Sequence, residues 1–444
     1  MPASDGLRLP RHTVEPKVGV LCRRRDGATD LYDPLSDSRA AAVRAGEDGG
    51  RAAFRFAEPA PDGHAEEARR YYFADPASAP APWNVELVDA CTLSCRHCYQ
   101  RSRRCDPWQR PATPHNDRWQ DLAEALLALG PDEASITGGE VLLSDAAAPL
   151  LAYLRSRRPD LRLRVLLSGV APVQRRTFQN LVPHLRRLGA HAKVALYGPS
   201  EAVHDWVTRS PGSWLDTLEM IDALRDVEVS TSVSYEMLGR TAHAAEETVA
   251  FLNERVGGAF TITTLIYPSR DPAAGWGPPD LLPPARLADL LGRPAFAALP
   301  VDYLSFQPRC GSGCRFPTVT ASGRVLSCAV VGGSDCGSAY DDANALGRAG
   351  RSAPAPRAAD APGPCGECAV RPICKQCVAF LGKEGPLADY CALVRESARV
   401  VIERIRTALE QGYQFLHPEA EGAWNRLQPA AGVRGSESAA AQPT

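Results

Sequence analysis

The sequence predicts an α/β fold with a parallel sheet, followed by a cysteine-rich C-terminal domain. Three observations lead to this prediction. From Trp83 to about Leu265, short apolar strands alternate with amphipathic helices, a pattern typical of parallel strands joined by crossover helices. Six such strand–helix units are present, too few for a closed eight-stranded barrel. Beyond them, eight cysteines at ordered spacings fall within residues 310–391.

Composition limits the classes of protein that the chain can be. With 444 residues, 44% of them hydrophobic, it can form a large core and at least one further domain. A formal net charge of -2 gives no electrostatic reason to expect nucleic acid or a membrane surface as a partner. No apolar run reaches the roughly 18 residues of a membrane span, and we see no signal peptide, so we expect a cytoplasmic protein. In that setting, 14 cysteines predict metal sites rather than disulfides.

Residues 1–80 contain no cysteine cluster and predict a β-hairpin, because Asp26 and Gly27 form a turn signal between two strand-like runs. A charged helix is expected around residues 64–72, followed by a Pro/Ala linker from Asp75. Cys22 is interpreted as a buried strand residue. The hairpin resembles the start of the winged-helix peptide-recognition domain of enzymes that modify ribosomally made peptides. The alternative is a β-rich extension packed on the main domain.

The six strands are predicted from apolar runs, and two intervening helices from apolar residues at helical spacing. These helices cover residues 119–129 and 178–188 and are ended by Gly130 and Gly189. In parallel α/β folds, ligands bind at the carboxyl ends of strands, so motifs that follow a strand are the candidates for a site. The predicted strands are 85–88, 134–136, 163–167, 194–196, 227–233 and 260–265.

The first such motif is CTLSCRHC, which places the thiols of Cys91, Cys95 and Cys98 directly after the first strand. Structural zinc sites and fully ligated iron–sulfur clusters normally use four protein ligands, so three thiols leave one metal position open. The alternative is a zinc knuckle whose fourth ligand is His97 or a distant thiol.

This motif resembles that of the radical S-adenosylmethionine (radical SAM) enzymes, which implies a partial (β/α)6 TIM-like barrel. In that family three cysteines hold a [4Fe-4S] cluster and SAM binds the fourth iron, which assigns Cys91, Cys95 and Cys98 as ligands. ITGGE after the second strand resembles the family motif that holds the SAM amino group. An ordinary glycine-rich turn is the alternative. The resemblance assigns these residues to SAM: Thr137, Gly138, Gly139 and Glu140, with Ser168 after the third strand.

The fourth strand leads into another stretch that is similar to the family, although Tyr197 stands where relatives carry an acidic residue. The resemblance implies that this stretch lines the SAM and substrate cavity, and it adds Arg209 to the catalytic set. His204 and Asp205 could equally be structural caps, since Asp is favoured at helix starts. The residues that match are Gly198, His204, Asp205, Arg209, Gly212 and Ser213.

The C-terminal cysteines resemble the SPASM domain, which binds two auxiliary [4Fe-4S] clusters. Gly323 provides the expected hairpin turn before Cys328. The spacing from Cys374 to Cys377 is two residues where the family usually has three. Two zinc-ribbon sites are the alternative. The resemblance implies one cluster on Cys310, Cys314, Cys328 and Cys377, and a second on Cys365, Cys368, Cys374 and Cys391. Cys105 and Cys336 are left over.

The combined resemblance implies an oxidoreductase that installs a C–C or thioether crosslink in a ribosomally synthesised peptide (RiPP). Its expected partners are a leader-bearing precursor peptide and an electron donor such as flavodoxin or ferredoxin. Alternatives are dehydrogenation of a Ser or Cys side chain or of a small alcohol, and a non-catalytic zinc or electron-transfer scaffold. Ala329 counts against the sulfatase-maturase type, which has an acidic residue there. The predicted domains are 1–80, the barrel 81–270, a connection 271–308, the SPASM domain 309–395, and a helix with a disordered tail, 396–444.

Overall fold

In a computed structural model, the chain forms two compact units. One comprises residues 76–282 and 311–355, and the other residues 1–75, 283–310 and 356–444. The structure describes residues 21–25, 28–34, 38–43, 53–56, 83–100, 102–108, 117–129, 131, 133–264, 266–267, 281–296, 318–326, 328–329, 335–340, 368–371, 373–374, 386–415, 424–425 and 427.

The first unit contains a nine-stranded sheet in the order β12-β11-β10-β9-β8-β5-β13-β14-β15. Its six strands from β5 to β12 are all parallel, which confirms the predicted strand–helix alternation. The register aligns Val85 of β5 with Ile136 of β8, and Ile136 with Val165 of β9, and all three side chains are fully buried. These strands are β5 Trp83–Glu86, β8 Glu133–Thr137, β9 Arg162–Leu167, β10 His191–Ala195, β11 Thr231–Glu236 and β12 Phe260–Thr263.

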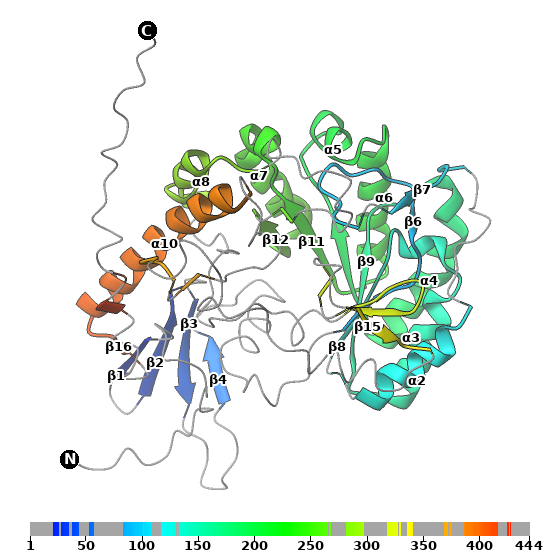
Figure 1. The fold of residues 1–444 in the computed structure, drawn as a ribbon, viewed down its shortest axis with the longest axis horizontal. Helices are drawn as coiled ribbons and strands as arrows, with labels where there is room; N and C mark the ends of the chain where they lie inside the picture. Colours follow the sequence, from blue (N-terminus) through cyan, green and yellow to red (C-terminus); the bar gives the residue numbers. More distant parts are fainter. Residues whose placement is uncertain are drawn as a thin grey trace, which may run out of the picture. The chain divides into compact units, whose positions relative to one another are not determined.

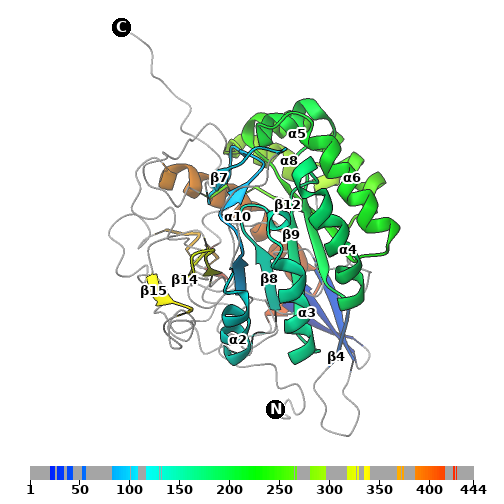
Figure 2. The same ribbon diagram turned by 90° about the vertical axis from the view of Figure 1, so that its right-hand side faces the viewer.

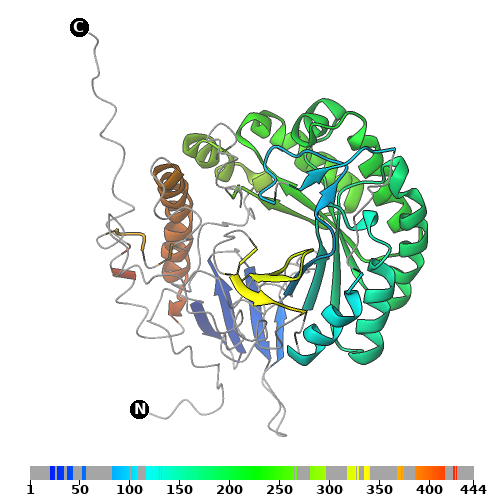
Figure 3. The ribbon, with the colours of Figure 1, turned by 45° about the vertical axis from the view of Figure 1, so that its right-hand side comes forward.

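Helices alternate with these strands and lie on the outer side of the curved sheet, in cyan to green in Figure 3. In Figure 2, α3 and α4 lie in front of β8 and β9. Both helices predicted from apolar spacing are confirmed, and Gly189 ends α4 in a left-handed conformation. The helices are α2 Trp119–Leu129, α3 Ala147–Arg157, α4 Arg175–Leu188, α5 Glu201–Thr208, α6 Ser213–Asp226 and α7 Ala245–Val256, with short 3-10 helices η1 Val141–Leu143, η2 Pro172–Gln174 and η3 Gly239–Ala244.

The fifth strand differs from its prediction. Residues 227–233 were expected to form it, but Val227 caps the end of α6 and the strand begins at Thr231. Val229 is buried and its N–H donates to Leu224 O of α6 at 2.9 Å, so these two valines belong to the C-terminal cap of the helix and not to the strand. The strand consequently runs three residues beyond its predicted end and finishes at Glu236.

A short hairpin extends the sheet at its β5 edge. It pairs β13 Thr318–Val319 parallel to β5 and antiparallel to β14 Arg324–Leu326, and β15 Asp335–Ser338 then pairs with β14. The turn between β13 and β14 includes Gly323 with a positive φ of 79°, as predicted. Cys328 therefore follows a strand that belongs to the same sheet as the strand leading to Cys91.

The second unit contains a five-stranded antiparallel sheet in the order β16-β1-β2-β3-β4. Its first pair confirms the predicted N-terminal hairpin, with half-buried Cys22 in β1. In Figure 1 the long helix α10 lies beside this sheet. The elements are β1 Leu21–Arg25, β2 Ala28–Asp33, β3 Ser38–Val43, β4 Ala53–Phe56, α8 Pro284–Leu291, a 3-10 helix Pro294–Phe296, α10 Pro386–Glu410 and β16 Gln414–Phe415.

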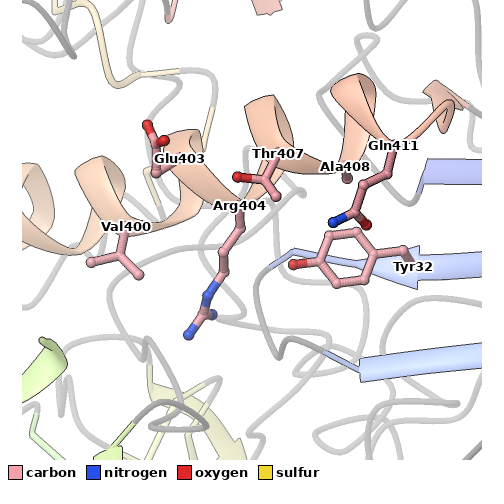
Figure 4. Close-up of a pocket in the computed structure, with 7 residues that line it drawn as sticks. All are labelled: Tyr32, Val400, Glu403, Arg404, Thr407, Ala408 and Gln411. Carbon is pink, nitrogen blue, oxygen red and sulfur yellow. The ribbon is translucent and has the colours of Figure 1, made fainter. Parts of the chain in front are cut away.

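Tyr32 of β2 and one face of α10, extended by Gln411, line a pocket of about 350 Å³ (Figure 4). Two hydrogen bonds join the helix end to the sheet: Arg404 Nη1 donates to Pro34 O at 3.2 Å, and Arg23 Nη1 donates to Gln411 O at 3.0 Å. The predicted C-terminal helix is confirmed, but it begins at Pro386, so Cys391 lies inside it rather than before it.

Several predictions fall outside the described residues. They are the charged helix at 64–72, the linker from Asp75, and the tail after residue 427. Among the described helices, none is both long enough and apolar enough to cross a membrane.

Candidate active site

The cysteine motif begins in a strand and continues as a loop. Cys91 ends β6 Ala90–Cys91, which pairs with β7 Arg103–Arg104, and its carbonyl accepts the N–H of Cys105 at 2.9 Å. Leu93 N–H points back at Cys91 Sγ, 3.4 Å away. Cys91 is buried, whereas Cys95 and Cys98 are half-buried, so the loop is held at its first cysteine and more accessible at the other two.

The loop is also fastened to the C-terminal end of α5. The N–H groups of Ser94 and Arg96 donate to Thr208 O and Val207 O at 3.0 and 2.9 Å. Arg96 Nε donates to Trp206 O at 2.9 Å, and its guanidinium lies 4.2 Å from the centre of the Trp206 ring. The last carbonyls of a helix have no partner within the helix, so α5 provides acceptors that fix the conformation of this loop.

The paired glycines let the chain after β8 run directly against the start of the cysteine motif. Gly139 N–H donates to Val88 O at 2.7 Å, and Glu140 N–H donates to Ala90 O at 2.9 Å. A Cβ on Gly139 would lie 2.1 Å from Ala90 O, and one on Gly138 would lie 2.6 Å from Val88 O. Only glycine fits where the two segments lie this close together. The hydrogen bond to Ala90 O therefore holds Glu140 beside the residue that precedes Cys91.

Glu140 is 2% exposed, and both of its carboxylate oxygens accept hydrogen bonds. Leu142 N–H donates to Oε1 at 3.0 Å, while the N–H of Ser168, at 3.0 Å, and its hydroxyl donate to Oε2. The predicted residues Glu140 and Ser168 are therefore in direct contact. Burial raises the pKa of Glu140 to about 7. An ammonium group bound beside it would favour the ionised carboxylate and lower that pKa again.

Burial dominates the electrostatics of the thiols as well. It raises the pKa of Cys95 to about 12 and the pKa of Cys91 well above its usual range, and the charge of Glu140 adds to the effect at Cys91. Metal and cluster ligands must be thiolates. A positively charged metal centre would therefore displace protons from these groups when it binds.

Tyr197, which directly follows β10 and the buried Leu196, lies beside the cysteine loop. Its ring is 4.9 Å from that of His97, edge to face, and 5.3 Å from that of His204. Tyr197 N–H donates to Nδ1 of His204 at 3.1 Å, so the His204 proton is on Nε2. His204 is fully buried, and burial lowers its pKa to about 4, so it is a neutral support for Tyr197.

Asp205 has the structural role of a helix cap, the alternative that the sequence left open, because its carboxylate caps the start of α6. Its carboxylate accepts Gly212 N–H at 2.6 Å, Ser213 Oγ at 2.8 Å and Trp214 N–H at 2.8 Å. Arg209 is exposed at the end of α5, in a left-handed conformation with φ 56°, and its N–H donates to Asp205 O at 2.8 Å. A catalytic role for Arg209 stays a prediction.

Sequence reasoning missed Glu236, the last residue of β11. Burial raises the pKa values of Cys95 and Tyr197, and the charge of Glu236 adds to both effects. The signal was present, because Glu236 follows the rule that polar residues at strand ends form the site. The prediction ended this strand at residue 233 and so removed Glu236 from consideration.

The structure describes four of the eight C-terminal thiols. Cys328 is buried after β14, Cys368 and Cys374 lie in a short turn segment, and Cys391 lies in α10. Cys310, Cys314, Cys365 and Cys377 lie outside the described residues. The two proposed auxiliary ligand sets therefore stay predictions.

The chemistry of the three loop thiols fits a cluster. Among the described residues, no three His, Cys, Asp or Glu side chains lie close enough to hold one metal ion. The cysteine ligands of a four-iron cluster each bind a different iron and stand further apart than the ligands of a single ion. Three mutually interacting thiols beside a buried carboxylate are thus compatible with a cluster that leaves one iron for another ligand.

Comparisons with known proteins agree with this geometry. Residues 85–252 match the Radical SAM superfamily. The structure is similar to anSMEcpe with bound AdoMet and Cp18Cys peptide, with TM-score 0.56 and 14% identity over 75% of this chain and 99% of that chain. A second anSMEcpe structure, with bound AdoMet alone, gives TM-score 0.53 and 14% identity over 74% and 100%. Streptococcus suis SuiB gives TM-score 0.41 and 13% identity over 75% and 88%. No curated protein matches the chain.

Residues 85–252 thus form a radical SAM domain. A domain of this superfamily implies a [4Fe-4S] cluster and SAM. The loop with Cys91, Cys95 and Cys98 lies within the matched residues, as do the glycine pair and Glu140.

Proposed function

We propose that the chain is a peptide maturase that uses SAM and three [4Fe-4S] clusters to install a C–C or thioether crosslink in a ribosomally synthesised peptide. The observation that carries this proposal is the joint presence of a three-thiol loop in a radical SAM domain and eight further ordered thiols. The likeness to anSMEcpe, which was solved with a bound peptide, supports the choice of a peptide as substrate.

In this proposal, Cys91, Cys95 and Cys98 hold the first cluster. Thr137, Gly138, Gly139, Glu140 and Ser168 hold SAM. When bound, the two groups supply a 5'-deoxyadenosyl radical that removes a hydrogen atom from the substrate. Glu140 accepts the SAM ammonium group, and the two glycines let the backbone before Glu140 lie directly against that of Val88 and Ala90.

The auxiliary ligand sets extend the proposal. Cys328 follows β14, which belongs to the same sheet as β5, the strand that leads to Cys91. This shared sheet supports a SPASM-type arrangement, in which an additional cluster lies at the same edge of the sheet as the first. Two further clusters would favour a net oxidation of the substrate over a redox-neutral change. Ala329 follows Cys328 and has no acid–base group. This disfavours an enzyme of the sulfatase-maturase type, in which an acidic residue at this position takes the proton of the substrate while a serine or cysteine is oxidised.

Cofactor content can be tested by anaerobic reconstitution of the full chain. We expect about twelve irons, four for each of three clusters, and SAM-dependent release of 5'-deoxyadenosine. Replacing Cys91, Cys95 and Cys98 together with Ala should leave about eight irons and abolish SAM cleavage. The matched control is Cys105→Ala, which removes a nearby thiol that we do not assign as a ligand. Retained cleavage in the triple variant, or zinc in place of iron, would contradict the assignment.

The substrate class can be tested with short peptides encoded beside the gene for this chain. Incubation with the reconstituted enzyme, SAM and reduced flavodoxin should remove two hydrogen atoms per crosslink, and tandem mass spectrometry should show no fragmentation between the joined residues. The same mass loss with full fragmentation would instead identify dehydrogenation. Modification of a small alcohol but of no peptide would refute the peptide proposal.

A further inference from the structure

The loop that follows β9 is fastened to the first turn of α6. Thr217 Oγ1 donates to the carbonyl of Ser168 at 3.1 Å, and Val170 N–H donates to Asp216 O at 3.3 Å. Thr217 is fully buried and Ser168 is half-buried. Ser168 in turn provides both donors to Oε2 of Glu140. A continuous set of hydrogen bonds therefore links α6 to the carboxylate of Glu140.

The Ser168 carbonyl needs this support because the next residue is a glycine. Gly169 has a φ of 143°, a conformation that residues with a Cβ rarely adopt. A glycine also leaves the peptide group before it freer to rotate, so the direction of the Ser168 carbonyl has to be fixed by a donor. The Thr217 hydroxyl is that donor, and a Cβ on Gly169 would lie 3.3 Å from its oxygen.

The Thr217 hydroxyl has two acceptors. Its Oγ1 lies 2.8 Å from Ser213 O, one turn earlier in α6, and 3.1 Å from Ser168 O. A hydroxyl has one hydrogen, so the two carbonyls share it. A bond to the carbonyl four residues earlier is common for threonine in helices and by itself would be a local feature of α6. The bond to Ser168 is the one that connects the helix to the site.

The first turn of α6 is held by the segment that also holds the cysteine loop. Ser213 Oγ lies 2.7 Å from Thr208 Oγ1, and both side chains are buried. Thr208 O accepts the N–H of Ser94, which belongs to the cysteine loop. Glu140 and the cysteine loop are therefore both connected to the junction of α5 and α6.

We propose that Thr217 is a positioning residue for SAM. By fixing the carbonyl of Ser168, its hydroxyl directs the two Ser168 donors at Oε2 of Glu140 and keeps the carboxylate where it receives the SAM ammonium group. Thr217 lies 49 positions after Ser168, and no sequence motif selects it. The inference rests on the proposed function, because it takes Glu140 as the acceptor of that ammonium group.

The test measures SAM binding to the full chain, reconstituted anaerobically, by equilibrium dialysis with labelled SAM and without a reductant. Thr217→Val removes the hydroxyl at nearly constant volume, and Thr217→Ser keeps it. We expect the dissociation constant of SAM to rise about fivefold to tenfold in Thr217→Val, the effect of one neutral hydrogen bond, and to change little in Thr217→Ser. Methylthioadenosine, which lacks the amino-acid part of SAM, should bind equally to wild type and Thr217→Val.

The matched control is Thr248→Val. Thr248 is also a fully buried helical threonine whose hydroxyl donates to the carbonyl four residues earlier, Ala244 O at 2.7 Å, but it lies in α7. This control should leave SAM binding unchanged. Iron content and thermal unfolding verify that each variant is loaded and folded. Thr217→Ala takes the place of Thr217→Val if the valine variant does not load its clusters.

Several results would overturn this inference alone. They are wild-type affinity for SAM in loaded Thr217→Val, equally weak binding in Thr217→Ser or Thr248→Val, and an equal loss of affinity for methylthioadenosine. Failure of both hydroxyl-free variants to load iron would also overturn it, because Thr217 would then serve the fold or cluster assembly. A wild-type chain that carries its iron but binds no SAM would overturn the proposed function as well.

Discussion

Replacing His204 with asparagine should remove a defined pH dependence from the stability of the fold. His204 is fully buried, its Nδ1 accepts the N–H of Tyr197, and its Nε2 has no hydrogen-bond partner among the described residues. Burial lowers its pKa from 6.5 to about 4. An asparagine side-chain oxygen can accept the same N–H but does not titrate, so it isolates the protonation from the hydrogen bond.

The sign follows from the lowered pKa. The folded state favours neutral His204, so its contribution is fully present above pH 6.5 and is lost as the pH falls from 6.5 toward 4. With one pKa unit corresponding to about 1.4 kcal/mol, the folded state should lose about 2 kcal/mol between pH 7 and pH 5 from this residue. Glu140 and Asp216 act in the opposite direction, because burial raises their pKa values to about 7 and about 6.

Only the difference between wild type and His204→Asn separates these effects, since Glu140 and Asp216 are common to both proteins. The assay is urea unfolding of the cluster-free, reduced protein at pH 7 and pH 5. We expect the stability of wild type relative to His204→Asn to fall by about 2 kcal/mol over this interval. An equal change in both proteins would refute the idea that His204 stays neutral in the fold.

Three further substitutions test other contacts of the site. Gly139→Ala places a Cβ 2.1 Å from a backbone oxygen and should cost about 3 kcal/mol in chemical unfolding, whereas Gly292→Ala, with its nearest atom at 3.4 Å, should cost little. Arg96→Ala removes the bond to Trp206 O and the contact with its ring, and should cost about 1–2 kcal/mol and speed the loss of iron to a chelator. Asp205→Ala leaves three donors at the start of α6 without their acceptor and should lower the free energy of unfolding by about 2 kcal/mol. Asp205→Asn should retain part of the stability that this cap contributes.

The sequence identified the parts of the site that rest on local patterns. Alternating apolar runs predicted the six parallel strands, which the sheet confirms, whereas the contacts of Gly139 with Val88 and Ala90 emerge only from the structure. Ser168 was assigned from the family resemblance of the residues after the third strand, and the structure places it against Glu140. Such features depend on the period of the chain and on residues close in sequence.

The contacts that the sequence could not predict are those between distant segments. Arg96 lies 110 positions from Trp206, and nothing in the sequence of either segment indicates that the cysteine loop is hydrogen-bonded to the end of α5. Glu236 was lost through a strand boundary, because Val227 and Val229 have high β-propensity although they complete the end of a helix. Tertiary packing decides such positions.

The pairing of β16 with β1 has a consequence for how the protein is made. Leu21 lies opposite Phe415, and Tyr32 packs against Tyr413 at 5.8 Å between ring centres, so the sheet of β1 to β4 gains an edge strand from residues far later in the sequence. During synthesis this sheet is completed only after β16 emerges, whereas the six parallel strands of the other unit, which lie between β4 and β16 in the sequence, are available to pair earlier. A nascent chain that stalls before residue 386 would lack both α10 and β16, so the sheet that begins with β1 would lack its edge strand and the helix beside it.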